Sequence, residues 1–232
     1  MLIDPHVHSK GISLCSRASV EEIIDFKKSR GYAAAILVNH CQPWYYEKSK
    51  HKQNMLKFVE EYNRGKTYAD NNNFKFFLGI EVTVDKPFYA DFLLYGVTEE
   101  FLINSPCLYA LTQEELYKLC RKNDVLIIQA HPFRAPIIPA SPNVVDGYEI
   151  NTQQNDLAYK DDVLNLAADT HKLVTAGTDY HGRAQDEFMG GMIVPDDINS
   201  AVDFKNYLKS TDKTELYLGG EILEVKKIPL DE

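Results

Sequence analysis

Short apolar runs alternate with longer amphipathic stretches along the chain. The apolar runs are rich in aliphatic and aromatic residues and are short enough for buried strands. They lie at residues 33–38, 74–82, 89–97, 125–130, 144–150 and 173–177, with further strands expected from residue 2 and at 192–195, 214–218 and 221–227. The amphipathic stretches at 19–31, 46–70, 112–123, 156–170 and 199–209 predict helices.

Two of these helices carry clear start signals. Ser19 is followed three residues later by Glu22, which is the spacing of a capping box, and Gly31 is placed to end the helix. Thr112 stands at the N-cap position of the third predicted helix. These signals support the alternation of strands and helices.

The alternation predicts the fold class. Parallel strands need crossover connections, so strands separated by helices imply an α/β protein with a largely parallel sheet. About seven such units in one chain favour a barrel over an open sheet. The 232 residues suit one large domain, and no linker or repeat divides them, so we expect a single domain over residues 1–232.

Metal-capable side chains stand directly after the predicted strands. Five of the seven histidines follow an apolar run, and two carboxylates occupy similar positions. These residues are His6, His8, His40, Glu81, His131, Asp179 and His181. In a barrel of parallel strands the carboxyl ends of all strands lie at one face, so these residues are expected to converge into one cleft.

Such a cluster is costly to bury unless cations neutralise it. Five imidazoles with two carboxylates form a ligand set for two or three divalent ions. His6 and His8 are two apart on an extended strand, so they face the same side and can bind one cation together. Asp4 lies on that face and is expected to orient a histidine, while Glu149 fits either site lining or an ordinary hydrogen bond at a strand end.

The ordered motifs DPHVH, NH, GIE, AHP and GTDYH, between residues 4 and 181, resemble those of the polymerase and histidinol phosphatase (PHP) superfamily. The resemblance implies a distorted, TIM-like (β/α)7 barrel with mostly parallel strands. It also implies a di- or trinuclear site of Mn, Fe or Zn that hydrolyses phosphoesters. By motif, the ligands would be His6, His8, Glu81 and Asp179 for the first metal, Glu81 and His131 for the second, and His40 and His181 for the third.

The first loop departs from the family's pattern. Members usually place Asp or His a few residues after the second motif histidine, as a ligand of the third metal, whereas SKGISLCSRAS at 9–19 offers neither. Cys15 is the candidate for an extra, thiolate ligand, and whether a third metal is bound stays open. Asn39 stands where Asp is common, which changes the expected hydrogen bonding around the ligands but not the ligands themselves.

The expected reaction is hydrolysis of a small phosphomonoester or nucleotide. Two bridged cations neutralise phosphoryl oxygens and lower the pKa of a shared water toward about 7, which gives a metal-bridging hydroxide as the nucleophile. The candidate catalytic residues are the ligand Asp179, Arg134 in the loop HPFR as the phosphate-binding guanidinium, and His181. His181 is the expected proton donor to the leaving group if the third metal is absent; otherwise that metal could take this role. Arg17 and Arg183 are further candidates for substrate binding, since both lie in loops that leave ligand motifs.

Charge and composition narrow the partners. The formal net charge of −9 argues against a long nucleic acid as substrate but allows a small phosphorylated one, because bound cations reverse the local sign. No apolar run is long enough for a membrane span, and the start MLIDPHVH does not resemble a signal peptide. Four irregularly spaced cysteines are expected as free thiols, which favours a cytoplasmic location. The oligomeric state is not predicted.

Two other functions stay open on the sequence alone. An amidohydrolase-like enzyme acting on C–N or ester bonds shares the barrel and the HxH pair, although Glu81 occupies the position where its carbamylated Lys would bridge the metals. A non-catalytic metal-binding PHP module is the other alternative, which the altered first loop leaves open.

Overall fold

One curved sheet forms the centre of the computed structural model, which describes residues 1–153, 156–183 and 188–226. Its strands run in the order β11-β10-β9-β1-β2-β4-β5-β6-β7-β8, and β3 pairs with β4. The strands are β1 (Leu2–Val7), β2 (Ala34–Leu37), β3 (His40–Cys41), β4 (Lys75–Val84), β5 (Ala90–Tyr95), β6 (Leu126–Gln129), β7 (Gly147–Asn151), β8 (Leu173–Gly177), β9 (Gly190–Ile193), β10 (Lys213–Leu218) and β11 (Glu221–Lys226).

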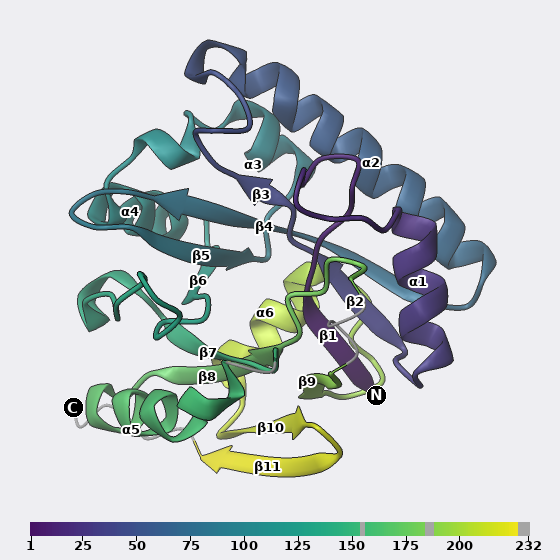
Figure 1. Ribbon diagram of the computed structural model, residues 1–232, viewed down its shortest axis with the longest axis vertical. Helices are drawn as coiled ribbons and strands as arrows, with labels where there is room; N and C mark the ends of the chain where they lie inside the picture. The colour runs from purple at the N-terminus through teal and green to yellow at the C-terminus, as the bar shows by residue number, and fades with distance from the viewer. Residues whose placement is uncertain (154–155, 184–187, 227–232) are drawn as a thin grey trace.

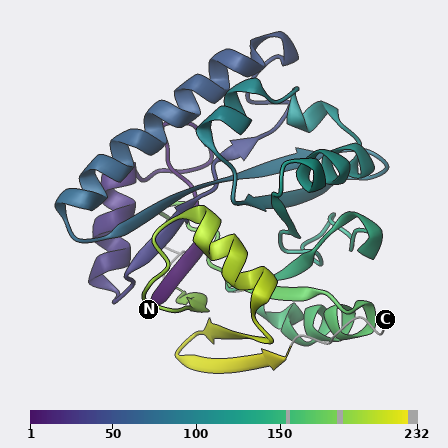
Figure 2. The same ribbon diagram turned by 180° about the vertical axis from the view of Figure 1, so that it is seen from behind.

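The helices lie outside the sheet (Figure 1). They are α1 (Val20–Ser29), α2 (His51–Asn71), α3 (Glu99–Asn104), α4 (Gln113–Lys122), α5 (Lys160–Thr170) and α6 (Ala201–Ser210). Helices α1 and α2 pack side by side on one flank, and α6 covers the face that Figure 2 turns toward the viewer. None of the described helices is both long and apolar enough to cross a membrane.

Local sequence explains where two helices begin. The Ser19 hydroxyl accepts a hydrogen bond from the Glu22 N–H, and the Glu22 carboxylate accepts one from the Ser19 N–H. Thr112 and Glu115 form the same reciprocal pair at the start of α4. Both predicted helix starts are therefore confirmed, and each satisfies backbone donors that would otherwise lack a partner. The short helix α3, capped by Thr98, was not predicted.

The sheet is mixed, which corrects the prediction of mostly parallel strands. The pairs β1–β2, β2–β4, β3–β4, β6–β7 and β7–β8 are parallel. The pairs β4–β5, β5–β6, β1–β9, β9–β10 and β10–β11 are antiparallel. Short connections explain the antiparallel pairs β4–β5 and β10–β11, because residues 85–89 and 219–220 are too few for the crossover that parallel strands need.

The sheet nearly closes into a barrel. The segment that follows β8 returns to the end of β1, where the His8 N–H donates to the Tyr180 carbonyl (2.9 Å) and the Tyr180 N–H donates to the His6 carbonyl (3.2 Å). Val7 and Tyr180 form a parallel bridge between them. The α/β, distorted TIM-like barrel expected from the sequence is confirmed, and its closure brings the DPHVH and GTDYH motifs side by side.

Apolar packing holds the first helix on the sheet. Helix α1 buries Val20, Ile23, Ile24 and Lys27, which recur at the three- and four-residue spacing of one helix face. The apolar members of this face pack with Leu37, Ala69 and Phe76 from β2, α2 and β4. Lys27 is fully buried with them, so it needs a partner of opposite charge.

Candidate metal centre

The seven side chains predicted as ligands lie together at one end of the barrel. Three groups among them have ligand atoms that all lie within 4.8 Å of one another. The groups are His6–His8–Asp179, His6–Glu81–His131 and His8–His40–His181. All seven are buried except His40, which is partly exposed. Because His6 and His8 belong to two groups each, the three candidate cation sites are neighbours.

The first group has the spacing of ligands around one cation. The Nε2 atoms of His6 and His8 lie 3.0 Å apart, and Oδ1 of Asp179 lies 3.3 Å and 3.0 Å from them. Two atoms that each lie 2.0–2.2 Å from one ion are separated by about 3.0–3.5 Å. The three atoms therefore fit a shared divalent cation.

Hydrogen bonds at Nδ1, on the other side of each ring from Nε2, fix the ring orientations of His6 and His8. A carboxylate can only accept, so Nδ1 of His6 donates to Oε1 of Glu149 at 2.7 Å and its Nε2 keeps a lone pair for a cation. The Ser13 hydroxyl donates to Asn39, which leaves its oxygen to accept from Nδ1 of His8 at 3.4 Å. Asn39 therefore contacts the His8 ring indirectly, through Ser13 of the first loop.

Glycine makes room for the Glu149 contact. A Cβ atom on Gly177 would lie 2.6 Å from Cβ of His6 and 2.7 Å from Oε1 of Glu149. Asp4 does not orient a histidine ring, because its Oδ1 accepts the backbone N–H of His6 at 3.1 Å. The partner expected for the ring of His6 is Glu149 instead.

Replacing Glu149 with Gln is expected to weaken metal binding by about 10–100-fold, because a neutral amide supports the His6 imidazole less well than a carboxylate does. Competition with a chromogenic chelator would measure the affinity. Glu100→Gln on the exposed face of α3 is the control and should leave it unchanged. Equal affinities for Glu149→Gln and wild type would contradict this role.

Glu81 lies close to histidines from all three groups of candidate ligands. Its Oε1 is 3.2 Å from Nε2 of His131, and its Oε2 is 3.4 Å from Nε2 of His8. Its Oε2 is also 2.7 Å from Nδ1 of His40, yet neither of these two buried atoms has a hydrogen-bond partner. Two close polar atoms that are not aligned for a hydrogen bond are typical of ligands directed at a common ion. A bridging carboxylate fits this position.

Burial and neighbouring charge set the protonation of the centre. Burial raises the pKa of Glu81, but His40 and His6 outweigh it and hold the pKa well below its usual range. Asp179 behaves alike, since His181, His6 and Arg134 lower its pKa against burial. Both carboxylates are therefore ionised at neutral pH and available as ligands, and the donor set suits Mn, Fe or Zn.

Two of the candidate ligand residues have a strained backbone. His131 and Asp179 have φ angles of 32° and 53°, in the left-handed region that L residues rarely adopt. Such a conformation costs about 1–2 kcal/mol per residue. Strain of this kind persists where the surrounding fold imposes it, and both residues belong to the candidate ligand groups.

Cys15 lies at the third group. Its Sγ is 3.1 Å from Nε2 of His181, and the Tyr45 hydroxyl donates to it at 3.1 Å. Burial raises the pKa of the thiol, but hydrogen bonds from His181 and His40 outweigh it and lower the pKa to about 5. Burial lowers the pKa of His40, while Glu81 and Cys15 raise it to about 10.

A cavity of about 400 Å³ opens onto the centre. Its walls include Cys15, His40, His131, Asp179 and His181, together with Trp44, Tyr45, Tyr89, Asp91, Arg134 and Arg183. Trp44 is 59% exposed and stacks on Tyr89, with the ring centroids 6.1 Å apart. The cavity has a volume suited to a small ligand.

The three candidate arginines differ in position. Arg134 lies in the cavity wall, where its Nη1 donates to Oδ2 of Asp179 at 2.7 Å and its Nε donates to Oδ2 of Asp156 at 2.7 Å. Arg183 also lines the cavity and donates to the Cys15 carbonyl at 2.9 Å. Arg17 is exposed and is not among the described residues of the cavity wall. The structure thus brings two of the three to the centre.

Two acidic residues near the cavity, Asp91 and Asp156, were not predicted as site residues. Asp91 is buried in β5 and accepts a hydrogen bond from Thr83 at 2.6 Å, and burial together with Glu81 raises its pKa. Its position within the otherwise apolar run YADFLLY was the signal that could have found it. Asp156 holds Arg134, and no local pattern marks that contact.

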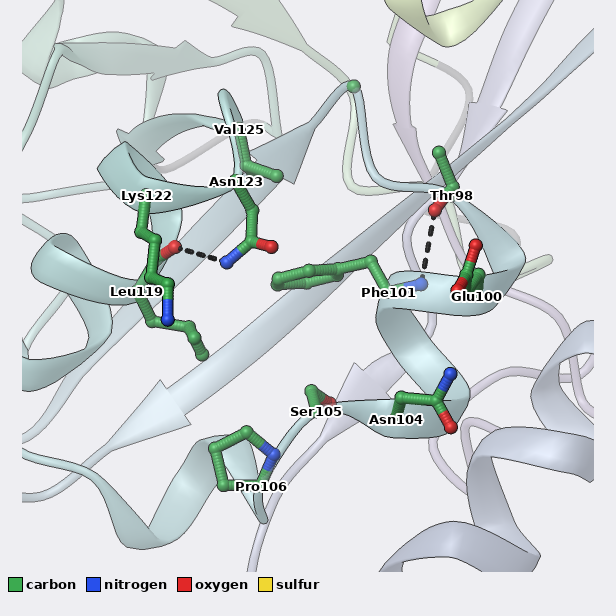
Figure 3. A pocket seen from close by; sticks show the side chains of 11 residues that line it. Thr98, Glu100, Phe101, Asn104, Ser105, Pro106, Leu119, Lys122, Asn123 and Val125 are labelled. Carbon is green, nitrogen blue, oxygen red and sulfur yellow. Dashed lines mark hydrogen bonds between the residues drawn. The ribbon is translucent and has the colours of Figure 1, made fainter.

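A separate cavity of about 470 Å³ lies between α3 and α4 (Figure 3). Its polar side chains serve the helix ends: the Thr98 hydroxyl accepts from the Phe101 N–H, and the Asn123 amide donates to the Leu119 carbonyl. Its described lining contains no His, Cys or Asp. We assign it no part in the metal chemistry.

No protein-family model and no curated protein matches the sequence. Solved structures share the fold. A two-domain protein from Bacteroides vulgatus, containing a predicted PHP-like metal-dependent phosphoesterase, is 16% identical with a TM-score of 0.64, over 96% of this chain and 66% of that one. PsfC from Pseudomonas syringae is 16% identical with a TM-score of 0.61, over 88% and 86%. The lesion-specific endonuclease PfuEndoQ from Pyrococcus furiosus is 13% identical with a TM-score of 0.53, over 93% and 51%.

Proposed function

We propose that the chain is a metal-dependent phosphoesterase that hydrolyses a small phosphomonoester or nucleotide. The main support for this proposal is the position of Glu81. Its carboxylate lies within 3.7 Å of ring nitrogens from four histidines, beside an open cavity. The shared fold with a PHP-like metal-dependent phosphoesterase supports it. Two bound divalent ions would neutralise phosphoryl oxygens and lower the pKa of water toward about 7.

The chain's own residues would bind the phosphate and deliver a proton. Arg134 and Arg183 bring positive charge to the cavity wall, where an anionic substrate would lie against them. His181 donates from Nδ1 to the Asp179 carbonyl at 2.7 Å, because a carbonyl can only accept. Its Nε2 therefore either binds a cation or, when protonated, can donate to the leaving oxygen.

The cavity favours a small substrate over a polymer. A volume of about 400 Å³ suits a ligand of nucleotide size or smaller, and the flat ring of Trp44 suits a planar group such as a base. The net charge of −9 does not favour a long polyanion. We therefore place phosphomonoesters and nucleotides ahead of a nucleic-acid strand.

The protein loaded with Mn or Zn is expected to release phosphate from p-nitrophenyl phosphate and from part of a panel of sugar phosphates and nucleotides. The same protein stripped with a chelator should release none, because the ions supply the charge neutralisation. A diester and an amide panel, run in parallel, measure the competing bond types. Fully metallated protein that hydrolyses no phosphomonoester would refute the proposal.

A further inference from the structure

The first loop, residues 9–19, places the sulfur atom of Cys15 beside His181, a member of the group His8–His40–His181. Cys15 Sγ lies 3.1 Å from Nε2 of His181, and Cys15 lines the same cavity as His40. His40 and His181 belong to one group of candidate ligands with His8. Cys15, His40 and His181 thus lie together in the cavity wall.

The His181 ring is oriented to share a cation with this sulfur. Its Nδ1 proton is committed to the Asp179 carbonyl, so Nε2 is the ring nitrogen that can bind a cation beside Cys15. Zinc binds sulfur at about 2.3 Å and imidazole nitrogen at about 2.0 Å, so tetrahedral ligands of these types are about 3.5 Å apart. The observed 3.1 Å between Sγ and Nε2 is close to that separation.

The loop is braced so that the sulfur stays in place. The Ser16 hydroxyl donates to the His8 carbonyl at 2.7 Å, and the Arg183 guanidinium donates to the Cys15 carbonyl at 2.9 Å. The Tyr45 hydroxyl accepts from the Cys15 N–H and donates to its sulfur. Donation to sulfur favours the thiolate, which is the form that binds metals.

The other three cysteines lie elsewhere. Cys41, Cys107 and Cys120 are buried in the apolar core, and Cys41 contacts the Tyr46 hydroxyl. Of the four cysteines, all within the described residues, Cys15 is the one that faces the histidines. Among the four cysteines, the contact with the candidate ligand His181 is therefore specific to Cys15.

We propose that Cys15 is a thiolate ligand of a third divalent ion, together with His40 and His181, and that it makes this position selective for zinc over manganese. Thiolates are soft ligands that favour Zn, whereas Mn prefers oxygen ligands. Two imidazoles and one thiolate leave a fourth position open, as in catalytic zinc sites. The inference rests on the metal centre of the proposed phosphoesterase, but its test does not depend on activity.

Cobalt(II) reports thiolate ligation directly. Metal-free protein, kept reduced and titrated with Co²⁺, is expected to develop an intense thiolate-to-cobalt charge-transfer band in the near ultraviolet. Cys15→Ser should lose the band, and Cys107→Ser, the control for removal of a thiol, should keep it. Absence of the band in the wild type, or its persistence in Cys15→Ser, would overturn the proposal.

Elemental analysis provides the second measurement. The wild-type chain is expected to retain one more zinc ion than Cys15→Ser after dialysis, and Cys15→Asp should regain an ion with manganese in place of zinc. Equal zinc contents in wild type and Cys15→Ser would count against the thiolate ligand. Phosphate release is assayed separately: a cobalt–thiolate band without any hydrolysis would refute the phosphoesterase and leave this ligand in place.

Discussion

Glu81→Gln is expected to abolish phosphoesterase activity and to reduce the metal content at more than one position. The substitution keeps the shape of the side chain but removes the charge that lies near His6, His8, His40 and His131. Loss of metal-based charge stabilisation worth several kcal/mol corresponds to a fall of about 10³-fold or more in kcat/KM. Kinetics with a phosphomonoester and elemental analysis of the same sample would measure both effects.

Glu149→Gln is the matched control for this experiment. It makes the same chemical change at a buried carboxylate that contacts the ring of one ligand, His6, from behind. Its expected cost is the smaller loss of about 10–100-fold in metal affinity, which excess metal should restore. Activity and metal content that survive Glu81→Gln would show that this carboxylate does not bridge the ions.

The convergence of the candidate ligands could be predicted from the sequence because it depends on strand ends. His8, His131 and Asp179 each come after an apolar run, and barrel geometry gathers the residues at the ends of such runs. The prediction of mostly parallel strands was wrong at β5, β9, β10 and β11. At β5 the short connection of residues 85–89 was itself visible in the sequence. Five residues between two apolar runs are too few for a crossover, so this length indicates an antiparallel pair.

Contacts between distant side chains could not be predicted in the same way. Asp4 was expected to orient a histidine ring because of its neighbours in sequence, but its carboxylate contacts Lys27 and Thr178. Arg134, which was expected to bind the substrate phosphate, pairs with Asp156 and Asp179, which lie 22 and 45 residues away in the sequence. Spacing along a strand determines which face a side chain occupies, whereas its partner depends on which loop packs against that face.

The Asp4–Lys27 pair gives the second large expected effect. Both side chains are fully buried, with Lys27 Nζ 2.5 Å from Oδ2 of Asp4 and 2.9 Å from Oγ1 of Thr178. Lys27→Met would leave the Asp4 carboxylate buried without its counter-charge, at an expected cost of about 3–5 kcal/mol in the free energy of unfolding. The midpoint of thermal unfolding should fall by roughly 6–20 °C.

The control is the neighbouring lysine of the same helix. Lys28 is exposed, so Lys28→Met should change the free energy of unfolding by no more than about 0.5 kcal/mol. The double variant Lys27→Met/Asp4→Asn should recover part of the loss, since it removes the unpaired charge as well. Urea unfolding of metal-free samples would measure all three, and a Lys27→Met cost equal to that of Lys28→Met would contradict the role of the pair.

The same pair connects stability to the metal centre. Asp4 accepts the N–H of His6 and the N–H of Thr178, so one carboxylate joins the HxH strand to the segment that carries Asp179. Lys27→Met is therefore expected to weaken metal binding as well as stability, although no atom of Lys27 belongs to the ligand set. Unchanged metal affinity together with lower stability would contradict this connection. It would show that the Asp4–Lys27 pair does not position His6 beside Asp179.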